Sequence, residues 1–416
     1  MQVIIRALSK FSALMLIVGY GVLIGLDVAP PSGLRNMVQN AHHELSDFAK
    51  HWRHDLGIDP TRMVVDRPEN PFARVDLDST LRMAGYRLIG GYFPDLNAEW
   101  GAILLDENNE ILHAWPFDYG DFVPPGRNRN ISQQGLAVFE DGSLVINYDV
   151  GEVLMRLGPC GDVIWKTEGI FHHVVHRSFD GTLWTWESQS MVQIDPQTGE
   201  RLRTISIKND IAAKSGYLGA FTMRTEAQEN GIKYFPEAYH ANDIEVLTPE
   251  FADAFPLFEA GDIMFSLREV NLVAVIDHQT LDIKWVQNGP WHRQHDPDFL
   301  PDGTISVYDN RMGSGSSQII RIDPVTGKFA ATLGREKGIS YYSWQRGKHQ
   351  VLANGNIIVT DPEGGQAFEA TEDGTVVWHF ENRFDETRNG VVTTALNLPT
   401  DFFSAGALDC SEADKP

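Results

Sequence analysis

The 416-residue chain contains little cysteine and few basic side chains, and each shortage excludes a class of protein. Cys160 and Cys410 are its only cysteines, so a disulfide framework and a four-sulfur metal site are both excluded, while a single bridge stays open. Lys and Arg number 34 against 57 Asp and Glu, and the net charge of −23 argues against nucleic acid as a partner, because a phosphate backbone requires basic surface. An anionic substrate must therefore be held by a local cluster of Arg and His.

One long uncharged apolar stretch is present, at residues 11–26. Its length is marginal for a membrane-spanning helix, which needs roughly 17–25 residues. The basic residues before it predict a cytoplasmic N-terminus, with the rest of the chain exported to the periplasm or the cell exterior. No clear small-residue cleavage site follows. We therefore predict that residues 1–31 are a retained signal anchor, with a cleaved signal peptide as the alternative, and that residues 32–81 are a helical stalk and connector.

From residue 85 onward the chain repeats a unit of short strands joined by Gly-containing turns. The turn glycines are Gly142, Gly181, Gly261, Gly303 and Gly355. Their spacings are 39, 80, 42 and 52 residues, and the long interval contains an insertion at residues 208–238. Four strands in roughly 40–50 residues are typical of a β-propeller blade. The sequence predicts an all-β fold, a six-bladed β-propeller at residues 82–400, followed by a C-terminal tail at residues 401–416.

The first repeat is incomplete. Residues 85–117 supply three strands and lack the leading one, whereas one more strand-like run follows the last repeat, at residues 390–398. If that run pairs with the first repeat, the ring closes and no edge strand is left free. We therefore predict that a C-terminal strand closes the first blade.

Histidines recur at one position of the repeat. Counting back eight residues from the turn glycine reaches His295 in one repeat and His173 in another, with Gly347 and Gln134 at the equivalent positions. The first strand of each blade lines the central channel, so His173 and His295 are predicted to face each other across it. Side chains that only fill a polar channel are the alternative interpretation.

The repeat between these two adds further polar residues at the same edge. His240 and Asn242 lie in the lead-in YHAND, and Arg268 ends the following strand. Together with the two channel histidines they predict a cluster of hydrogen-bonding and cationic groups, which must all find partners if they are buried.

Four neighbouring side chains are candidates for substrate contacts: His172, His292, Arg293 and His349. Alternation along a strand places His172 on the face opposite His173, so a structural role is its alternative. His292 competes with His295 for the reactive position, although the eight-residue register favours His295. Arg293 offers a second anion contact, and His349 can face the channel.

Residues 85–382 resemble the arylsulfotransferase family, six-bladed propeller enzymes that need no phosphoadenosine cofactor. The stretches that carry the resemblance include FHHVVHRSFDGTLW, YHANDIEVL, SLREVNLVAVID and GPWHRQHDPDFLPDGTISVYDNR. The resemblance implies transfer of a sulfuryl group from an aryl sulfate donor to a phenolic acceptor through a sulfated histidine, with no cofactor and no metal. By motif, His295 corresponds to the nucleophile, His240 and Asn242 to the family's His-x-Asn pair, Arg268 to a sulfate-holding arginine and His173 to another channel histidine.

These residue types suit the implied chemistry. A neutral imidazole is a good nucleophile near pH 7. Arg268, His240 and Asn242 would stabilise the negative charge on the sulfuryl oxygens, and a second histidine would move the phenol proton. Family members carry a separate N-terminal β-sandwich used in dimerisation, for which residues 32–81 are too few, so the oligomeric state stays open.

Two other functions stay open on the residues alone. A metal-dependent propeller enzyme would use His173, His240 and His295 as three ligands with an open fourth position. A membrane-tethered propeller that only binds or assembles other molecules is the non-enzymatic alternative, because a fold does not determine a function.

Overall fold

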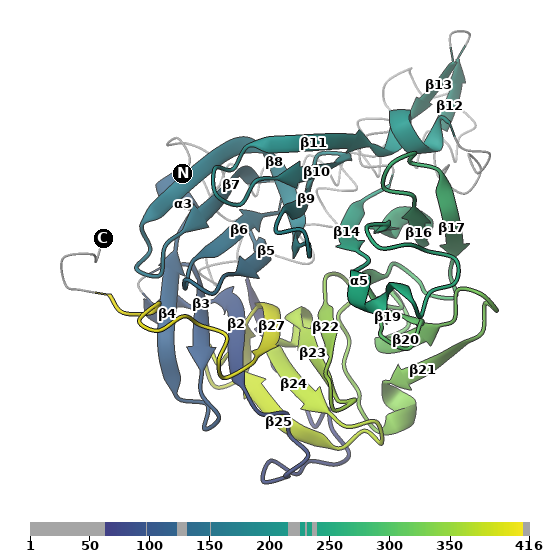
Figure 1. Ribbon diagram of the computed structural model, residues 1–416. Helices are drawn as coiled ribbons and strands as arrows, with labels where there is room; N and C mark the ends of the chain where they lie inside the picture. The colour runs from purple at the N-terminus through teal and green to yellow at the C-terminus, as the bar shows by residue number, and fades with distance from the viewer. Residues whose placement is uncertain are drawn as a thin grey trace, which may run out of the picture. The chain divides into compact units, whose positions relative to one another are not determined.

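The structure is a computed structural model that describes residues 63–96, 98–122, 131–149, 151–214, 225–228, 231–234 and 239–410. The chain divides into two compact units, residues 1–64 and 65–416, and the second carries the sheets described below (Figure 1). The predicted anchor at residues 11–26 and most of the predicted stalk lie outside the described residues. Within the described ranges, no helix has the length and apolar character needed to span a membrane.

The second unit is all-β and propeller-like, with short antiparallel sheets set around a centre (Figure 1). One four-stranded sheet consists of β27 (Val392–Leu398), β2 (Tyr86–Tyr92), β3 (Trp100–Leu105) and β4 (Ile111–Phe117). The next consists of β14 (Ala241–Val246), β15 (Ile263–Leu267), β16 (Leu272–Ile276) and β17 (Ile283–Asn288). Another consists of β18 (His295–Phe299), β19 (Ile305–Asp309), β20 (Gln318–Ile322) and β21 (Phe329–Leu333). The last consists of β22 (Lys348–Val351), β23 (Ile357–Asp361), β24 (Gln366–Ala370) and β25 (Val376–Glu381).

A seven-stranded sheet accounts for the remaining repeats. Its strands are β5 (Gln133–Val138), β6 (Leu144–Tyr148), β7 (Gly151–Leu157), β8 (Val163–Arg177), β9 (Leu183–Glu187), β10 (Ser190–Ile194) and β11 (Arg201–Ser206). The long strand β8 pairs with β7 from Val163 to Phe171 and with β9 from Phe171 to Arg177. Strand β8 is therefore the fourth strand of one four-strand set, β5–β8, and the first strand of the next, β8–β11.

Small elements complete the described fold. Strand β1 (Val64–Asp66) lies in the predicted connector and pairs with β26 (Arg388–Gly390), and β12 (Thr225–Gln228) pairs with β13 (Gly231–Tyr234) inside the insertion. The helical turns are α3 (Tyr119–Phe122), α5 (Pro249–Ala252), η1 (Pro94–Leu96), η2 (Ile207–Ala212), η3 (Arg268–Val270), η4 (Arg335–Lys337) and η5 (Pro362–Gly364). The rest of the insertion lies outside the described residues, so its predicted position over the channel mouth stays a prediction.

The predicted turn glycines all lie between the first and second strands of a four-strand set. Their φ angles are 79° at Gly142, 83° at Gly181, 95° at Gly261, 79° at Gly303 and 86° at Gly355. A residue with a side chain rarely adopts this conformation, which explains why glycine recurs there. The turns predicted from the sequence are confirmed.

The apolar core is divided among the faces between neighbouring sheets. Trp186 of β9 and Phe265 of β15 belong to one buried cluster, and Ile89 of β2 and Ile358 of β23 belong to another. Each sheet thus buries apolar side chains against the next one. This packing leaves the inner strand ends free to carry polar side chains.

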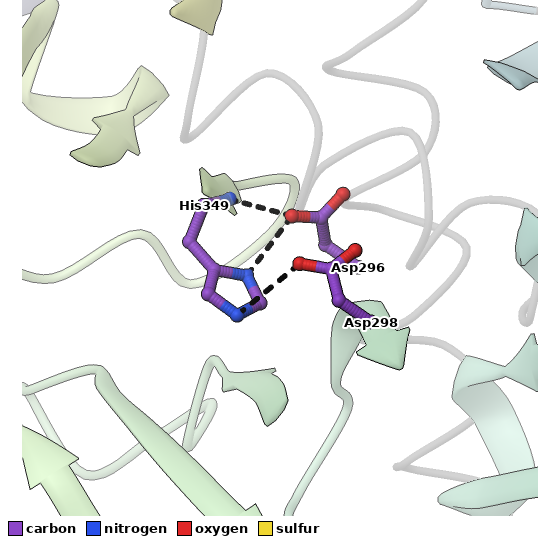
Figure 2. A group of neighbouring side chains, drawn as sticks. All are labelled: Asp296, Asp298 and His349. Carbon is purple, nitrogen blue, oxygen red and sulfur yellow. Dashed lines mark hydrogen bonds and ion pairs between the residues drawn. The ribbon is translucent and has the colours of Figure 1, made fainter. Parts of the chain in front are cut away.

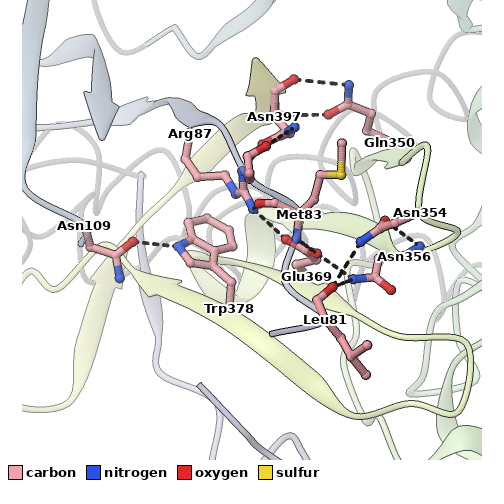
Figure 3. Close-up of polar contacts among 11 residues, drawn as sticks. Leu81, Met83, Arg87, Asn109, Gln350, Asn354, Asn356, Glu369, Trp378 and Asn397 are labelled. Carbon is pink, nitrogen blue, oxygen red and sulfur yellow. Dashed lines mark hydrogen bonds and ion pairs between the residues drawn. The ribbon is translucent and has the colours of Figure 1, made fainter. Parts of the chain in front are cut away.

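The C-terminal strand closes the first sheet as predicted: β27 pairs with β2 from Tyr86↔Leu398 to Gly91↔Val392. A buried ion pair secures this closure (Figure 3). Arg87 of β2 donates to Glu369 of β24 at 2.6 Å, and both side chains are 0% exposed. Arg87 also contacts Asn397 of β27, and the backbone N–H of Met83 donates to Glu369 at 2.8 Å. The network therefore joins the closing sheet to its neighbour.

The two cysteines form a disulfide bond between Cys160 and Cys410. The sequence left this pairing open. The bond ties the turn between β7 and β8 to the C-terminal tail, and the backbone N–H of Ser404 donates to the carbonyl of Glu140 at 2.8 Å. The described part of the predicted tail is therefore attached to the seven-stranded sheet.

Candidate active site

Four inner strands break their pairing register, three of them near their first residue and β8 just after its pairing passes from β7 to β9. The breaks lie at Gln133–Leu136 in β5, His172–Val175 in β8, Ala241–Asp243 in β14 and His295–Asp298 in β18. His173 at φ 62°, His240 at φ 48° and Asp296 at φ 50° are in the left-handed region, which residues with side chains seldom adopt. Bulges of this kind re-aim side chains, and such backbone strain concentrates at functional sites.

A small cavity of about 30 Å³ is lined by residues at these register breaks. Its lining includes Gln134, His173, His295 and Gly347, which are the four positions that lie eight residues before a turn glycine. Val174, Asn242, Asp243, Asp296, Arg346, Lys348 and Thr393 complete the lining. Equivalent positions of four repeats thus meet in one cavity.

The rings of His173 and His295 stack with centroids 6.5 Å apart and planes at 25°, so the prediction that they face each other is confirmed.

Two more histidines join this cluster. The Nε2 atom of His240 lies 3.2 Å from Nε2 of His173, and Nδ1 of His172 lies 2.7 Å from Nδ1 of His173. The prediction that His172 points to the face opposite His173 is wrong, because the register break at His172–Val175 interrupts the alternation of side chains. His172 contacts His173 instead.

The imidazoles of the cluster are held in their neutral form. Burial, followed by the nearby positive charge of Arg268, lowers the pKa of His295 to about 3 and that of His240 to about 2. Burial and the neighbouring His172 hold the pKa of His173 well below its usual value. Near pH 7 these rings are therefore neutral, and each has one nitrogen without a proton.

The hydrogen bond to Asn310 determines which ring nitrogen of His295 carries no proton. The amide nitrogen of Asn310 donates to the carbonyls of Ser343 at 2.8 Å and Arg346 at 2.5 Å. Its amide oxygen therefore faces Nδ1 of His295, at 2.7 Å. Because that oxygen can only accept, Nδ1 carries the proton and Nε2 carries the lone pair.

A carboxylate orients the two arginines beside the cluster. Glu269 accepts hydrogen bonds from Arg268 at 2.8 Å and from Arg293 at 2.5 and 2.6 Å. Burial lowers the pKa of Arg268, although an arginine still keeps its charge at neutral pH. Arg268, at the start of η3, is thus the cation whose field reaches His240 and His295.

None of the four predicted contact residues, which are His172, His292, Arg293 and His349, is among the residues that line the small cavity. His240 and Arg268 do not line it either. His292 is exposed and is not part of the cavity lining, so it does not share the position of His295. His349 is buried and lies between Asp296 and Asp298 (Figure 2). Its Nδ1 lies 3.0 Å from Asp296, and its Nε2 lies 2.8 Å from the hydroxyl of Ser306.

A larger cavity of about 850 Å³ adjoins this acidic group. Asp243, Glu245, Asp296 and Asp298 all line it. Burial, followed by the charge of Asp296, holds the pKa values of Asp243 and Asp298 well above their usual range, and burial raises that of Glu245 to about 8. A carboxyl group with a raised pKa keeps its proton near pH 7, so these three side chains line the larger cavity as neutral acids.

The residues that could hold a metal ion are not the three channel histidines. Among the described residues, the ligand atoms that converge within 4.8 Å belong to Asp296, Asp298 and His349. Both ring nitrogens of His349 already have hydrogen-bond partners.

Several residues that shape the site were not predicted from the sequence. Asn310 comes two residues after Tyr308, which pairs with His295 across the hairpin. Register counting along that hairpin would have placed Asn310 near His295. No feature of the sequence marked Glu269, next to Arg268, as a residue of the site. Lys348 follows one of the repeat-equivalent positions, and its amine donates to the carbonyl of Gln134 at 2.8 Å.

The family model of arylsulfotransferases (ASST) matches residues 130–383. The chain belongs to the arylsulfotransferase family. The matched range contains every histidine of the cluster together with Arg268 and Asn310. Membership supports an aryl sulfotransferase-like transferase, with aryl sulfates and phenols as the kinds of donor and acceptor. No curated protein matches the chain in sequence.

Solved structures resemble this arylsulfotransferase-family chain in fold. A protein of unknown function from Bacteroides caccae has a TM-score of 0.50 at 13% identity and covers 75% of this chain and 98% of its own. A functionally unknown protein from Desulfotomaculum acetoxidans has a TM-score of 0.45 at 13% identity, covering 76% of this chain and 100% of its own. The virginiamycin B lyase of Staphylococcus aureus with quinupristin has a TM-score of 0.35 at 13% identity, covering 61% and 71%. The likeness to the Bacteroides protein supports the fold alone.

Proposed function

We propose that this protein transfers a sulfuryl group from an aryl sulfate to a phenol through a sulfated His295. One observation carries the proposal: a buried, neutral imidazole has its Nδ1 proton held by Asn310 and its Nε2 lone pair left for reaction. A neutral nitrogen with a fixed tautomer is the form that a nucleophile requires. The family match supports the reaction class.

In the first step, Nε2 of His295 attacks the sulfur atom, an N–S bond forms and the S–O bond to the aryl group breaks. The electron pair of that bond leaves with the phenolate. Arg268 and the Asn242 amide supply the donors for the negative sulfuryl oxygens. In the second step, the oxygen of the acceptor phenol attacks sulfur, its proton passes to a base, and the N–S electron pair returns to Nε2.

The small cavity limits where the substrate lies. A volume of about 30 Å³ takes one small group, so the aryl ring must lie outside it, toward the channel mouth. We assign the choice of acceptor to the insertion at residues 208–238, which lies between β11 and β14 and ends shortly before His240.

We also propose six blades, because the seven-stranded sheet has the strands of two blades that share β8. Residues 1–31 would anchor the protein to a membrane, residues 32–81 would form the stalk, and the propeller at residues 82–400 would lie on the exported side. The disulfide bond supports an oxidising compartment.

Intact-mass spectrometry of the full-length protein, briefly mixed with a chromogenic aryl sulfate, tests the function. We expect a gain of one sulfuryl group in the native protein and no gain in His295→Ala. His292→Ala is the matched control, because that exposed histidine lies only three residues away and should leave the adduct intact. If several aryl sulfates give neither adduct nor phenol release, the proposed function is wrong.

A further inference from the structure

The carbonyl of Ser188 sets the proton positions of a chain of three histidines. Nε2 of His172 lies 2.7 Å from that carbonyl oxygen. A carbonyl has no proton to donate, so Nε2 of His172 must carry the hydrogen. In a neutral ring the other nitrogen, Nδ1, is then bare and can only accept.

The proton position on His172 determines the proton positions on His173 and His240. Nδ1 of His173 lies 2.7 Å from the bare Nδ1 of His172 and must donate to it. A neutral His173 then has a bare Nε2, which accepts from Nε2 of His240 at 3.2 Å. Burial lowers the pKa of His173 and that of His240, so neither ring carries a second proton. Nδ1 of His240 is left bare at the end of the chain.

We propose that His172 is a positioning residue that fixes the tautomers of His173 and His240, so that His240 offers its bare Nδ1 as the base for the incoming phenol. This inference rests on the proposed function for the identity of the phenol. It also assigns His173 a linking role, because both of its ring nitrogens already face other imidazoles.

The proton balance follows from this arrangement. As the phenol oxygen attacks the sulfuryl group on His295, its proton passes to Nδ1 of His240, and the N–S bond breaks with its electron pair returning to Nε2 of His295. The negative sulfuryl oxygens favour the charged form of His240, because an opposite charge raises the pKa of an imidazole. In the next turnover, His240 gives this proton to the phenolate that leaves the donor.

Two substitutions of His172 separate positioning from other roles. In His172→Gln the amide nitrogen can donate to Ser188 and the amide oxygen can accept from His173, yet the side chain cannot titrate. His172→Phe fills a similar volume and does neither. Circular dichroism and thermal unfolding of both variants check that the fold is kept.

The first readout is the ¹⁵N NMR spectrum of the full-length protein labelled at histidine, with His240→Gln used to assign the His240 signals. We expect a bare Nδ1 on His240 in the native protein and in His172→Gln, and a mixture of tautomers in His172→Phe. A protonated Nδ1 on His240 in the native protein would overturn the proposal. This readout requires no turnover, so it decides the tautomer even if the proposed function fails.

The second readout is transfer from the sulfated enzyme to a phenol. We expect about a 100-fold loss of this step in His172→Phe, at the lower end of general-base contributions, and at most about a threefold loss in His172→Gln. Formation of the adduct in a single turnover starts from neutral His240, which has no proton to give to the phenolate, so this step should change little in either variant. Equal impairment of both variants, or of neither, would contradict a positioning role.

Discussion

The hydrogen bond from His295 to Asn310 leads to the sharpest prediction, which concerns Asn310→Ala. The substitution removes three hydrogen bonds, to Nδ1 of His295 at 2.7 Å and to the carbonyls of Ser343 and Arg346 at 2.8 and 2.5 Å. At about 1 kcal/mol each, their loss should lower the free energy of unfolding by about 3 kcal/mol. That part of the effect is purely structural.

The loss of activity should exceed what unfolding explains. Without Asn310 the proton of His295 is free to occupy Nε2, and a ring protonated there has no lone pair with which to attack sulfur. A wrong histidine tautomer costs up to about 10⁴-fold in a serine protease triad. Because His295 is not locked into the wrong form here, we expect a smaller fall in kcat/KM, about 100-fold, or about 2.7 kcal/mol.

Asn389→Ala is the matched control. Asn389 is also fully buried, and its amide donates to the carbonyl of Gly364 at 2.9 Å and accepts from Arg67 at 3.1 Å. No hydrogen bond joins its side chain to a histidine within the described ranges. The loss of two hydrogen bonds should cost about 2 kcal/mol of stability and leave kcat/KM per folded molecule unchanged.

Stopped-flow measurement of the phenol burst from a chromogenic aryl sulfate gives the rate of the first step, and urea unfolding gives the folded fraction. The proposed tautomer effect is refuted if the burst rate of Asn310→Ala, corrected for unfolded protein, lies within about threefold of that of Asn389→Ala. It is equally refuted if the burst rate is normal and only KM rises, because a tautomer change acts on the reacting nitrogen.

Three further predictions concern pH, ring closure and the disulfide. Burial and a nearby arginine hold the pKa of His295 at about 3, so the pH profile of kcat/KM should show no fall near pH 6.5, and a fall there would contradict a neutral nucleophile. The contribution of His295 to folding stability is present above pH 6.5 and is lost as the pH falls toward 3. Glu369→Gln leaves the buried charge of Arg87 unpaired, and urea unfolding should show a loss of about 3–5 kcal/mol with activity per folded molecule kept; a loss below about 1 kcal/mol would count against the closure argument. Replacing Cys160 and Cys410 by serine should cost about 2–4 kcal/mol, and calorimetry with and without reductant should give the same difference.

The repeat and its register could be predicted because they depend on local chemistry. A turn that requires positive φ selects glycine, so Gly181 and Gly303 mark the hairpins, and counting back from them places His173 and His295 in the same cavity. The closing strand followed from the missing strand of the first repeat. Each of these features leaves a pattern within a few residues of sequence.

The remaining features depend on contacts that the pattern does not encode. A register break turned His172 toward His173, although strict alternation would have separated them. Asn310 reaches His295 only through the geometry of a hairpin, and Arg87 meets Glu369 across 282 residues of chain. A single sequence shows neither the bulge nor such distant pairs.

The pairing of β27 with β2 also has a consequence for how the protein is made. Tyr86 emerges from the ribosome more than three hundred residues before its partner Leu398, so the first sheet must wait, with one edge unpaired, for nearly the whole chain. During that time the edge is open to pairing with other chains. We expect folding to complete only after synthesis, and a chain that stops short of β27 to be recognised and degraded by cellular quality control.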